Sequence, residues 1–441
     1  MRGVLRFGAC VVGLFGVVAL AGACSSSPSP ASCVGTSSPL CAGSGRCIAL
    51  AACASESDVS TAFATAEDND TIAFAAGTYA FDNELALGMA NGVTVIGPGS
   101  GQVTLDFSNQ QAATEGVFAQ SVSNLTFQGF TVLDTPQNGF KVLSVTGVTF
   151  RDIGVTWTAQ DATDGAYGLY PVQSTQVLVD GCTISGAADS GIYVGQSQQI
   201  VVQNNTVFGN VSGIEIENSF YADVHDNIAH DNTAGILVFA LPGLQQDTGH
   251  DVRVYDNQIV NNNTKNFAVN SDIVSIVPAG TGFFVMANKN VEIFGNTITG
   301  NQTAAAGIIS YATSQQPYMD AAYYEWPSFV WLHDNTYSGN GTEPDARSQV
   351  GLLLSTGLGM YPNGGNVPDV MWDGFVDPSL PAGPDPMTIC VHEPTASAVC
   401  NMNFEDIDMS NPNVSKMDCD ATLFACTLPT LPPVTWPGLS P

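Results

Sequence analysis

The chain reads GLYPVQSTQVLVDGCTISGAADS from Gly168, GIYVGQSQQIVVQNNTVFGNVS from Gly191 and GIEIENSFYADVHDNIAHDNTA from Gly213. These stretches are variants of one repeat, and their starts lie 23 and 22 residues apart. Looser copies follow as VRVYDNQIVNNN, VEIFGNTITGNQ and FVWLHDNTYSGN. Repeats of this length, built from short β-branched strands and Gly/Asn turns, predict a solenoid.

Each repeat holds two runs in which apolar and polar residues alternate. In the third repeat these runs contain Ile214 and Ile216, then Ala222 and Val224. Alternation at period two marks strands with one buried face. A repeat of about 22 residues is too short for a strand, a crossover helix and a second strand. The repeat therefore predicts one turn of a right-handed, single-stranded parallel β-helix.

Asparagines recur at fixed places after the second strand of each repeat. Stacked coils would superpose them as two ladders at the turns, because asparagine tolerates left-handed backbone and bonds its own turn. A ligand-binding role is the less favoured alternative. The first set is Asn205, Asn227, Asn257, Asn296 and Asn335, and each is followed five residues later by Asn210, Asn232, Asn262, Asn301 and Asn340 respectively.

The N-terminus resembles a bacterial lipoprotein signal. Two arginines precede an apolar run that ends in LAGA before Cys24, although the first alanine stands where such signals usually carry leucine. The resemblance implies removal of residues 1–23, lipidation of Cys24 and anchoring in the cell envelope, with Ser25 favouring the outer membrane. An ordinary secretory signal that is cut nearby is the alternative. No later run is long and apolar enough to span a bilayer.

The cysteines agree with export. Two even clusters in an exported chain predict disulfides within each cluster, although the pairing order cannot be read from sequence. A zinc site is less favoured, because neither cluster contains a CxxC pair and only His392 lies close to one. Cys182 stands alone and is predicted to be a buried thiol. The clusters are Cys33, Cys41, Cys47 and Cys53, and Cys390, Cys400, Cys419 and Cys426.

The charge balance is strongly acidic. The chain has 10 basic and 40 acidic residues, and loss of Arg2 and Arg6 with the signal leaves 8 basic residues and a net charge of −32. Such a surface disfavours nucleic acid and anionic membranes as partners. It also disfavours bare polyanionic sugars unless metal ions intervene. No cofactor is assigned from the sequence, and Ca²⁺ is left open.

These features divide the chain into four predicted segments. A short amphipathic helix over residues 58–67 is placed to cover the open end of the solenoid. The C-terminal segment is rich in Pro and Gly and is expected to fold over the last coil; a separate binding module is the alternative. The segments are a signal peptide (1–23), a Ser/Pro tether with a Cys-rich part (24–57), the capped β-helix (58–342) and a C-terminal cap region (343–441).

One face of the predicted coils carries unusual side chains. Tyr170, Tyr193, Glu215, Glu217 and Phe239 occupy outward positions between inward aliphatic residues, and stacked strands lie about 4.8 Å apart. Rings that can stack on a pyranose beside carboxylates predict a sugar-binding site. A metal site and inert solubilising charges remain the alternatives.

Two insertions are expected to wall this face into a groove, because longer insertions in solenoids tend to lie on the binding face. The first, TWTAQDATDGAYG, supplies Trp157 and Asp164, and the second, LPGLQQDTGHD, supplies His250. The region around Trp372 is the next candidate should this groove be inactive.

Glu215 and Glu217 are candidate catalytic residues. Two residues apart on one strand, their Cα atoms lie about 6.6–7 Å apart. Inverting glycosidases hold their acid and base roughly 6.5–9.5 Å apart. Any such pair on a strand meets this condition, so calcium binding by the pair stays open.

Residues 70–342 resemble bacterial right-handed parallel β-helix proteins of the pectate-lyase-like superfamily, with carbohydrate-binding and sugar-hydrolysis repeats. The region from Gly168 to Asn210 is most similar to the repeats of mannuronan C5-epimerases, which read G-F-D-P-H-E-Q-T. Pro171 matches, but Tyr170 and Val172 replace the aspartate and histidine of that motif. This departure argues against epimerase or lyase activity and leaves glycoside hydrolysis as the favoured reaction.

The combined expectation is a monomeric, lipid-anchored envelope protein that binds a polysaccharide in a groove lined by Tyr and Glu. Cleavage of that polysaccharide is left open. The alternative is a non-enzymatic surface adhesin or structural module.

Overall fold

A computed structural model describes residues 32–42, 45–269, 272–381, 386–406 and 416–439. Residues 1–32 and 33–441 are separate units, and every helix and strand of the described residues lies in the second. The predicted signal and Cys24 fall outside the described residues, so both stay predictions. Within the described residues, no helix has the length and apolar character needed to cross a bilayer.

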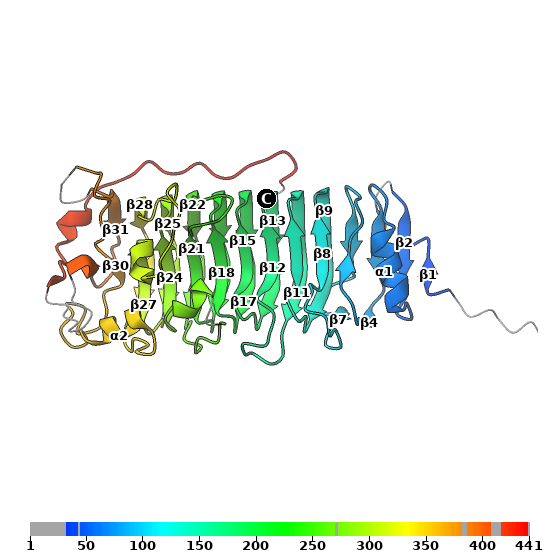
Figure 1. Cartoon of the computed structure of the whole chain (residues 1–441), viewed down its shortest axis with the longest axis horizontal. Coiled ribbons are helices and arrows are strands. Elements are labelled where there is room, and N and C mark those ends of the chain that lie inside the picture. Colours follow the sequence, from blue (N-terminus) through cyan, green and yellow to red (C-terminus); the bar gives the residue numbers. More distant parts are fainter. Residues whose placement is uncertain (1–31, 43–44, 270–271, 382–385, 407–415, 440–441) are drawn as a thin grey trace, which may run out of the picture. The chain divides into compact units, whose positions relative to one another are not determined.

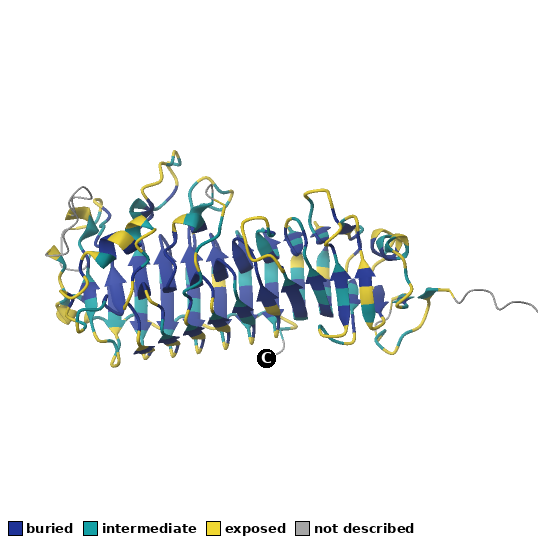
Figure 2. Cartoon of the chain, turned by 90° about the horizontal axis from the view of Figure 1, so that it is seen from below, coloured by how far each residue is buried: buried dark blue, intermediate teal, exposed yellow. Residues whose placement is uncertain are grey.

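Parallel strands stack into a right-handed β-helix, as the repeat predicts (Figure 1). A typical turn contributes three strands, such as β15 (Ser190–Gly195), β16 (Gln198–Gln203) and β17 (Thr206–Phe208). Each pairs in parallel with its counterpart one coil later, so that Ile192 lies beside Ile214. The inward aliphatic residues of successive coils therefore form continuous stacks in the core. Figure 2 shows that the strands are largely buried, while the loops beside them are exposed.

The described strands form two sheets, of 11 and 21 strands. The 11-stranded sheet takes the first strand of each turn. It consists, in spatial order, of β5 (Leu85–Ala86), β8 (Val117–Gln120), β10 (Phe140–Leu143), β12 (Tyr167–Val172), β15, β18 (Ser212–Glu217), β21 (Ala234–Phe239), β24 (Thr281–Met286), β27 (Ala304–Ile309), β30 (Val370–Trp372) and β32 (Val399–Asn401).

The 21-stranded sheet takes the other two strands of each turn. It consists of β1 (Val34–Gly35), β2 (Cys47–Leu50), β3 (Thr71–Phe74), β4 (Gly77–Ala80), β6 (Thr94–Ile96), β7 (Val103–Asp106), β9 (Ser123–Leu133), β11 (Thr146–Thr156), β13 (Thr175–Asp180), β14 (Thr183–Ser185), β16, β17, β19 (Phe220–His225), β20 (Ile228–His230), β22 (His250–Tyr255), β23 (Gln258–Val260), β25 (Lys289–Phe294), β26 (Thr297–Thr299), β28 (Ser328–His333), β29 (Thr336–Ser338) and β31 (Ile389–His392).

Both predicted asparagine ladders are present, and they lie inside the coils. Asn205 Nδ2 donates to Asn227 Oδ1 at 2.9 Å, and Asn227 Nδ2 donates to Asn257 Oδ1 at 2.9 Å. Each ladder amide also donates to a backbone carbonyl of an earlier coil, as Asn227 does to Val202. The left-handed residue of the turn is the one before the ladder asparagine, for example Asp226 with φ 54°. The ladder asparagines therefore satisfy buried backbone groups, while their neighbours make the bend.

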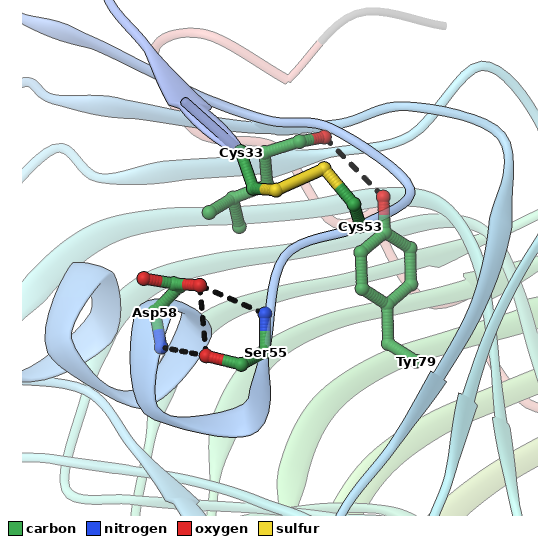
Figure 3. The surroundings of a disulfide bond; sticks show 6 residues. Cys33, Cys53, Ser55, Asp58 and Tyr79 are labelled. Atoms are coloured by element: carbon green, nitrogen blue, oxygen red, sulfur yellow. Dashed lines mark hydrogen bonds between the residues drawn. A yellow bond between two sulfur atoms is a disulfide. The ribbon is translucent and has the colours of Figure 1, made fainter. Parts of the chain in front are cut away.

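An N-terminal helix covers the first coils. Helix α1 (Glu56–Ala64) starts two residues before the predicted position, because Ser55 and Asp58 form a reciprocal capping box (Figure 3). The helix buries Phe63, whose ring packs 6.5 Å from that of Phe74. The open end of the solenoid is thereby closed by apolar contact.

Both cysteine clusters are oxidised within themselves, as predicted. The pairs in the early cluster are Cys33–Cys53 and Cys41–Cys47, and those in the late cluster are Cys390–Cys426 and Cys400–Cys419. Cys182 is a buried free thiol, and its backbone N–H donates to Asn205 Oδ1 at 2.8 Å at the start of the first ladder.

The sheets continue past residue 342, where the sequence repeat ends. Strands β30, β31 and β32 add pairings to β27 and β28 without the Gly/Asn turn pattern. The remaining elements around them are helix α2 (Gln349–Ser355) and the 3-10 turns η1 (Ile273–Ile276), η2 (Tyr311–Ser314), η3 (Phe404–Asp406) and η5 (Ala421–Phe424).

The end of the chain forms an extended strap, defined here as residues 427–439. It leaves the Cys390–Cys426 disulfide and runs back along the 21-stranded sheet (Figure 1). The Leu431 N–H donates to Glu292 at 2.8 Å, and the Val434 N–H donates to Asp223 at 3.0 Å. Its sequence, TLPTLPPVTWPGL, suits a polyproline II conformation, in which every third residue returns to one face.

Candidate functional site

The outer face of the 11-stranded sheet brings together the tyrosines and glutamates singled out in the sequence. Strand register places Tyr193 beside Glu215 and Gly195 beside Glu217, while Phe239 follows Glu217 on the next coil. The alternation between inward aliphatic and outward polar residues therefore placed these side chains on the correct face.

The face is not the open groove that was expected. Glu215, Glu217 and Tyr193 are only 1%, 6% and 5% exposed. From β21 onward the outward positions are apolar, with Phe239 and Phe284 among them, and they form a second hydrophobic cluster outside the coils. Residues of this cluster come from 272–280, 310–327 and 342–369, so apolar burial by these segments covers the later coils.

Three tyrosine rings border the covered region. The ring centroids of Tyr167, Tyr170 and Tyr193 lie 4.6–5.0 Å apart in tilted and edge-on arrangements. Tyr167 and Tyr170 are half-buried, whereas Tyr193 is buried behind them. Burial raises the pKa of Tyr170 to about 12 and the pKa of Tyr193 well above its ordinary value, so these hydroxyls remain protonated donors at neutral pH.

Three carboxyl groups lie behind the tyrosines and are called here the acid cluster: Asp189, Glu215 and Glu217. Ser190 Oγ lies 2.9 Å from Asp189 Oδ1 and 2.6 Å from Glu215 Oε2. A hydroxyl has a single proton to donate, so both contacts are hydrogen bonds only when one of these acids is protonated. Glu215 Oε1 is buried and has no hydrogen-bond partner among the described residues. An ionised Glu215 would therefore hold an uncompensated charge.

Desolvation is the largest cause of the raised pKa of every member of the acid cluster. It raises the pKa of Asp189 and of Glu217 to about 7, and the pKa of Glu215 well above its ordinary value. Repulsion by Asp189 and Glu217 acts on Glu215 in the same direction. At neutral pH, Glu215 is accordingly the protonated member, which donates to Ser190 while Ser190 donates to Asp189.

Tyr193 reaches the acid cluster because its ring leans across Gly195. Its hydroxyl donates a short hydrogen bond to Glu217 Oε1. A Cβ atom at Gly195 would lie 2.3–2.7 Å from the Tyr193 ring, so only glycine leaves room for that ring to lean across. Gly195 is thus a positioning residue for the Tyr193–Glu217 pair.

The earlier coils leave the adjoining surface open. Lys141, next to Tyr170 in register, forms an ion pair with Glu115 at 3.2 Å. The Lys141 ammonium also lies 5.6 Å from the centre of the Tyr170 ring. A half-exposed polar surface therefore leads up to the tyrosines from the N-terminal side.

The two predicted walls lie at opposite ends of the strands of the 11-stranded sheet. Residues 157–166 precede the start of β12, and residues 240–249 follow the end of β21. Trp157 does not line a wall. It is 2% exposed in the core, and its Nε1–H donates to Thr135 at 2.7 Å. Asp164 stays in its insertion, where it accepts from the Asp161 N–H.

His250 lies away from the acid cluster. It belongs to β22 in the 21-stranded sheet, where its ring stacks on Phe220 at 4.8 Å. Trp372, on β30, is 4% exposed and packs in the core beneath the late coils.

Sequence reasoning missed Asp189 and treated Tyr167 only as part of an insertion. Asp189 precedes the strand at the position that Val211 and Thr233 occupy in the next two repeats. An acid in a column of uncharged residues was the signal that could have found it. Within the described ranges, no group of three or more His, Cys, Asp or Glu side chains is arranged to hold a metal. The Ca²⁺ prediction therefore gains no support from this geometry.

Comparison with known proteins agrees with the fold. The family model of the right handed beta helix region matches residues 91–242. The chain is similar to right-handed β-helix proteins. No curated protein matches its sequence.

Several solved structures are similar over most of the β-helix. The mannuronan C-5 epimerase AlgE4 A-module of Azotobacter vinelandii is 16% identical, with 65% of this chain and 84% of that chain covered and a TM-score of 0.45. An alginate lyase from Paenibacillus sp. str. FPU-7 is 16% identical, with 66% and 96% covered and a TM-score of 0.46. PfbA, a surface adhesin of Streptococcus pneumoniae, is 10% identical, with 61% and 65% covered and a TM-score of 0.37.

Proposed function

We propose that this chain binds a polysaccharide on the outer face of the 11-stranded sheet. The observation that carries the proposal is the tyrosine cluster bordering three buried carboxyl groups on the surface of a solenoid. Burying several ionisable groups in one place lowers stability, and such arrangements concentrate at functional sites.

The exposed part of the site suits a sugar chain. Tyr167 and Tyr170 offer aromatic surface for the C–H face of a pyranose, and Lys141 and Glu115 offer partners for hydroxyl groups. The coils before β12 are open on this face, whereas those from β18 onward are covered. A bound glycan would therefore lie along the early coils, and its end would meet the tyrosines that border the acid cluster.

A binding experiment with a matched variant tests this proposal. The wild-type protein would be titrated calorimetrically against a panel of neutral and acidic polysaccharides. Tyr170→Ala is expected to weaken the binding of the responding glycan at least about fivefold, since a stacked ring contributes on the order of 1 kcal/mol. Tyr255→Ala is the control, because Tyr255 is also half-buried and ring-stacked but lies on the 21-stranded sheet. Equal affinities in the two variants would place the glycan elsewhere.

Hydrolysis of the bound glycan is a second candidate function, favoured by the different pKa values within the acid cluster. Glu215 stays protonated at neutral pH, and Glu217 has a pKa of about 7. In an inverting reaction Glu215 would give its proton to the leaving oxygen. Glu217 would take a proton from the water that attacks the anomeric carbon as the glycosidic bond breaks.

A reducing-end assay separates hydrolysis from binding alone. Glu215→Gln should abolish the release of reducing ends while Tyr170-dependent binding persists. Release at the wild-type rate by Glu215→Gln would remove Glu215 from the acid role. Binding without any turnover by the wild-type protein would instead favour a surface adhesin.

We also propose that the protein is exported and anchored in the cell envelope through Cys24. The support is the resemblance of residues 1–24 to a lipoprotein signal and the two fully paired cysteine clusters. Cys24→Ala should move the protein from the membrane fraction to the soluble fraction. Unchanged membrane partitioning would reject the anchor.

A further inference from the structure

A cavity of about 430 Å³ lies at a corner of the β-helix, away from the acid cluster. Strands β22, β25 and β28 of the 21-stranded sheet supply His250, Lys289 and Phe329 to its lining, and Tyr324 and Asp377 come from later loops. The volume falls within the range of small-molecule sites, roughly 300–1,000 Å³.

The carboxylate of the cavity already has donors. Asp377 accepts from the Ser379 N–H at 2.8 Å and from the Tyr324 hydroxyl, and these bonds hold its pKa below the ordinary value. The neighbouring Asp251 accepts from His250 Nδ1 at 2.5 Å and from Asn290 at 3.2 Å. The acceptors around the cavity are therefore engaged with protein groups.

The donors of the cavity are less engaged. Lys289 forms no ion pair among the described residues, and its ammonium lies 5.5 Å from the centre of the Phe329 ring. Strand register places Lys289 beside His250, whose ring is held flat on Phe220. Within the described part of the chain, His250 Nε2 has no hydrogen-bond partner. An ammonium and an imidazole N thus lie next to each other without an acceptor.

We propose that this cavity binds a small sugar that bears a carboxylate. The carboxylate would accept from Lys289 and His250 Nε2, while Tyr324 and Phe329 would contact the ring. Lys289 and Lys265 are both exposed and form no ion pair among the described residues, but Lys289 lines this cavity, where an anionic ligand would complement its ammonium. The site is independent of the polysaccharide site proposed above.

Titration with D-glucuronate, D-glucose and acetate tests the site in the full exported chain. Glucuronate should bind more tightly than both glucose, which lacks the carboxylate, and acetate, which lacks the ring. Lys289→Met should weaken glucuronate binding at least about tenfold, the effect expected for loss of one charged hydrogen bond. Lys265→Met is the control, because Lys265 is an exposed lysine that does not line the cavity.

Three results would overturn the proposal. Glucuronate could bind no better than glucose or acetate, or Lys289→Met could match Lys265→Met. A loss of glucuronate binding in Tyr170→Ala, with Lys289→Met unaffected, would place the ligand at the tyrosine cluster instead. His250→Gln supplies a second variant, and it should weaken glucuronate binding while leaving the urea midpoint within error of wild type.

Discussion

Two buried polar arrays run across neighbouring coils of this protein, and they obey opposite rules. In the first asparagine ladder every amide both donates and accepts, as Asn227 does between Asn205 and Asn257. In the acid cluster Glu215 Oε1 has no hydrogen-bond partner within the described part of the chain, and Glu215 is repelled by Asp189 and Glu217. The ladder lies inside the coils, whereas the acid cluster lies on their outer face.

The two arrays differ in whether the hydrogen bonds of their buried polar groups are complete. A buried polar group is tolerated without loss of stability when its hydrogen bonds are complete, and it is destabilising when they are not. The ladder meets this condition and joins one coil to the next. The acid cluster fails it at Glu215 Oε1, and this loss of stability is the reason why we propose that a ligand or a reaction uses the cluster.

A third array shows that outward carboxylates can also be compensated. Asp223 and Glu292 lie on the 21-stranded sheet beneath the strap, and both are 3% exposed. Arg253 lies between them in register and donates to Asp223 at 3.2–3.3 Å, while the strap supplies the Leu431 and Val434 N–H groups. Burial alone therefore does not distinguish the acid cluster; a buried carboxyl oxygen without a donor among the described residues, Glu215 Oε1, does.

The largest effect is expected from breaking the ladder. Asn227→Ala removes the acceptor for the Asn205 N–H and Nδ2 groups, which lie 3.0 and 2.9 Å away. Unsatisfied buried donors destabilise, so the free energy of unfolding should fall by about 3 kcal/mol. Urea denaturation followed by circular dichroism measures this change. Asn263→Ala is the control, since Asn263 adjoins the second ladder but is only half-buried. A loss below about 1 kcal/mol in Asn227→Ala would contradict a structural role for the ladder.

The next effect is a pH dependence to which the acid cluster should contribute most, because Asp189 and Glu217 have higher pKa values than Asp373, whose pKa is raised to about 6. Asp189 and Glu217 have a folded-state pKa of about 7, above their ordinary values of 3.8 and 4.5. Between about pH 4 and pH 7 the folded state therefore binds more protons than the unfolded state. The free energy of unfolding should therefore fall as pH rises from about 4 to about 7, by about 3 kcal/mol for Glu217.

Glu217→Gln should flatten this dependence. Urea midpoints of the wild type and the variant would be compared at pH 5 and pH 8, because other carboxyl groups with shifted pKa, such as Asp70 and Asp373, affect both proteins equally. Parallel pH profiles in the two proteins would show that Glu217 titrates normally in the folded state.

A smaller effect on stability is expected where the strap covers Asp223, Arg253 and Glu292. Val434→Pro keeps an extended strap but removes the N–H that Asp223 accepts. Loss of one hydrogen bond to a charged group should lower the free energy of unfolding by about 1.5 kcal/mol. Thr435→Pro is the matched control, because the Thr435 N–H makes no hydrogen bond among the described residues. Equal stability of the two variants would mean that the strap does not compensate Asp223.

The sequence predicted the whole asparagine ladder but only part of the acid cluster, and the reason is physical. Coil stacking repeats every 22 to 39 residues, so side chains that serve the stacking, such as Asn227 and Ile214, repeat with it and could be read directly. Asp189 occurs in one coil only, and the segments that cover the neighbouring later coils, 272–280, 310–327 and 342–369, come from distant parts of the chain. Function at a single coil breaks the repeat, and burial by distant loops leaves no local pattern.

The smallest effect on stability is expected at the residue with the largest predicted role. Glu215 is protonated at neutral pH, and glutamine has the same shape and also carries a donor toward Ser190. Glu215→Gln should therefore change the free energy of unfolding at pH 7 by less than about 0.5 kcal/mol, with any change toward greater stability, since no charge remains to be desolvated. Differential scanning calorimetry at pH 7 measures it, and Glu217→Gln provides the contrast because it weakens the bond from Tyr193. A loss of more than about 1 kcal/mol in Glu215→Gln would mean that Glu215 is ionised and compensated in the folded protein. The acid cluster would then belong with the ladder and the strap as a structural array, and the case for a functional site at the tyrosines would rest on their exposure alone.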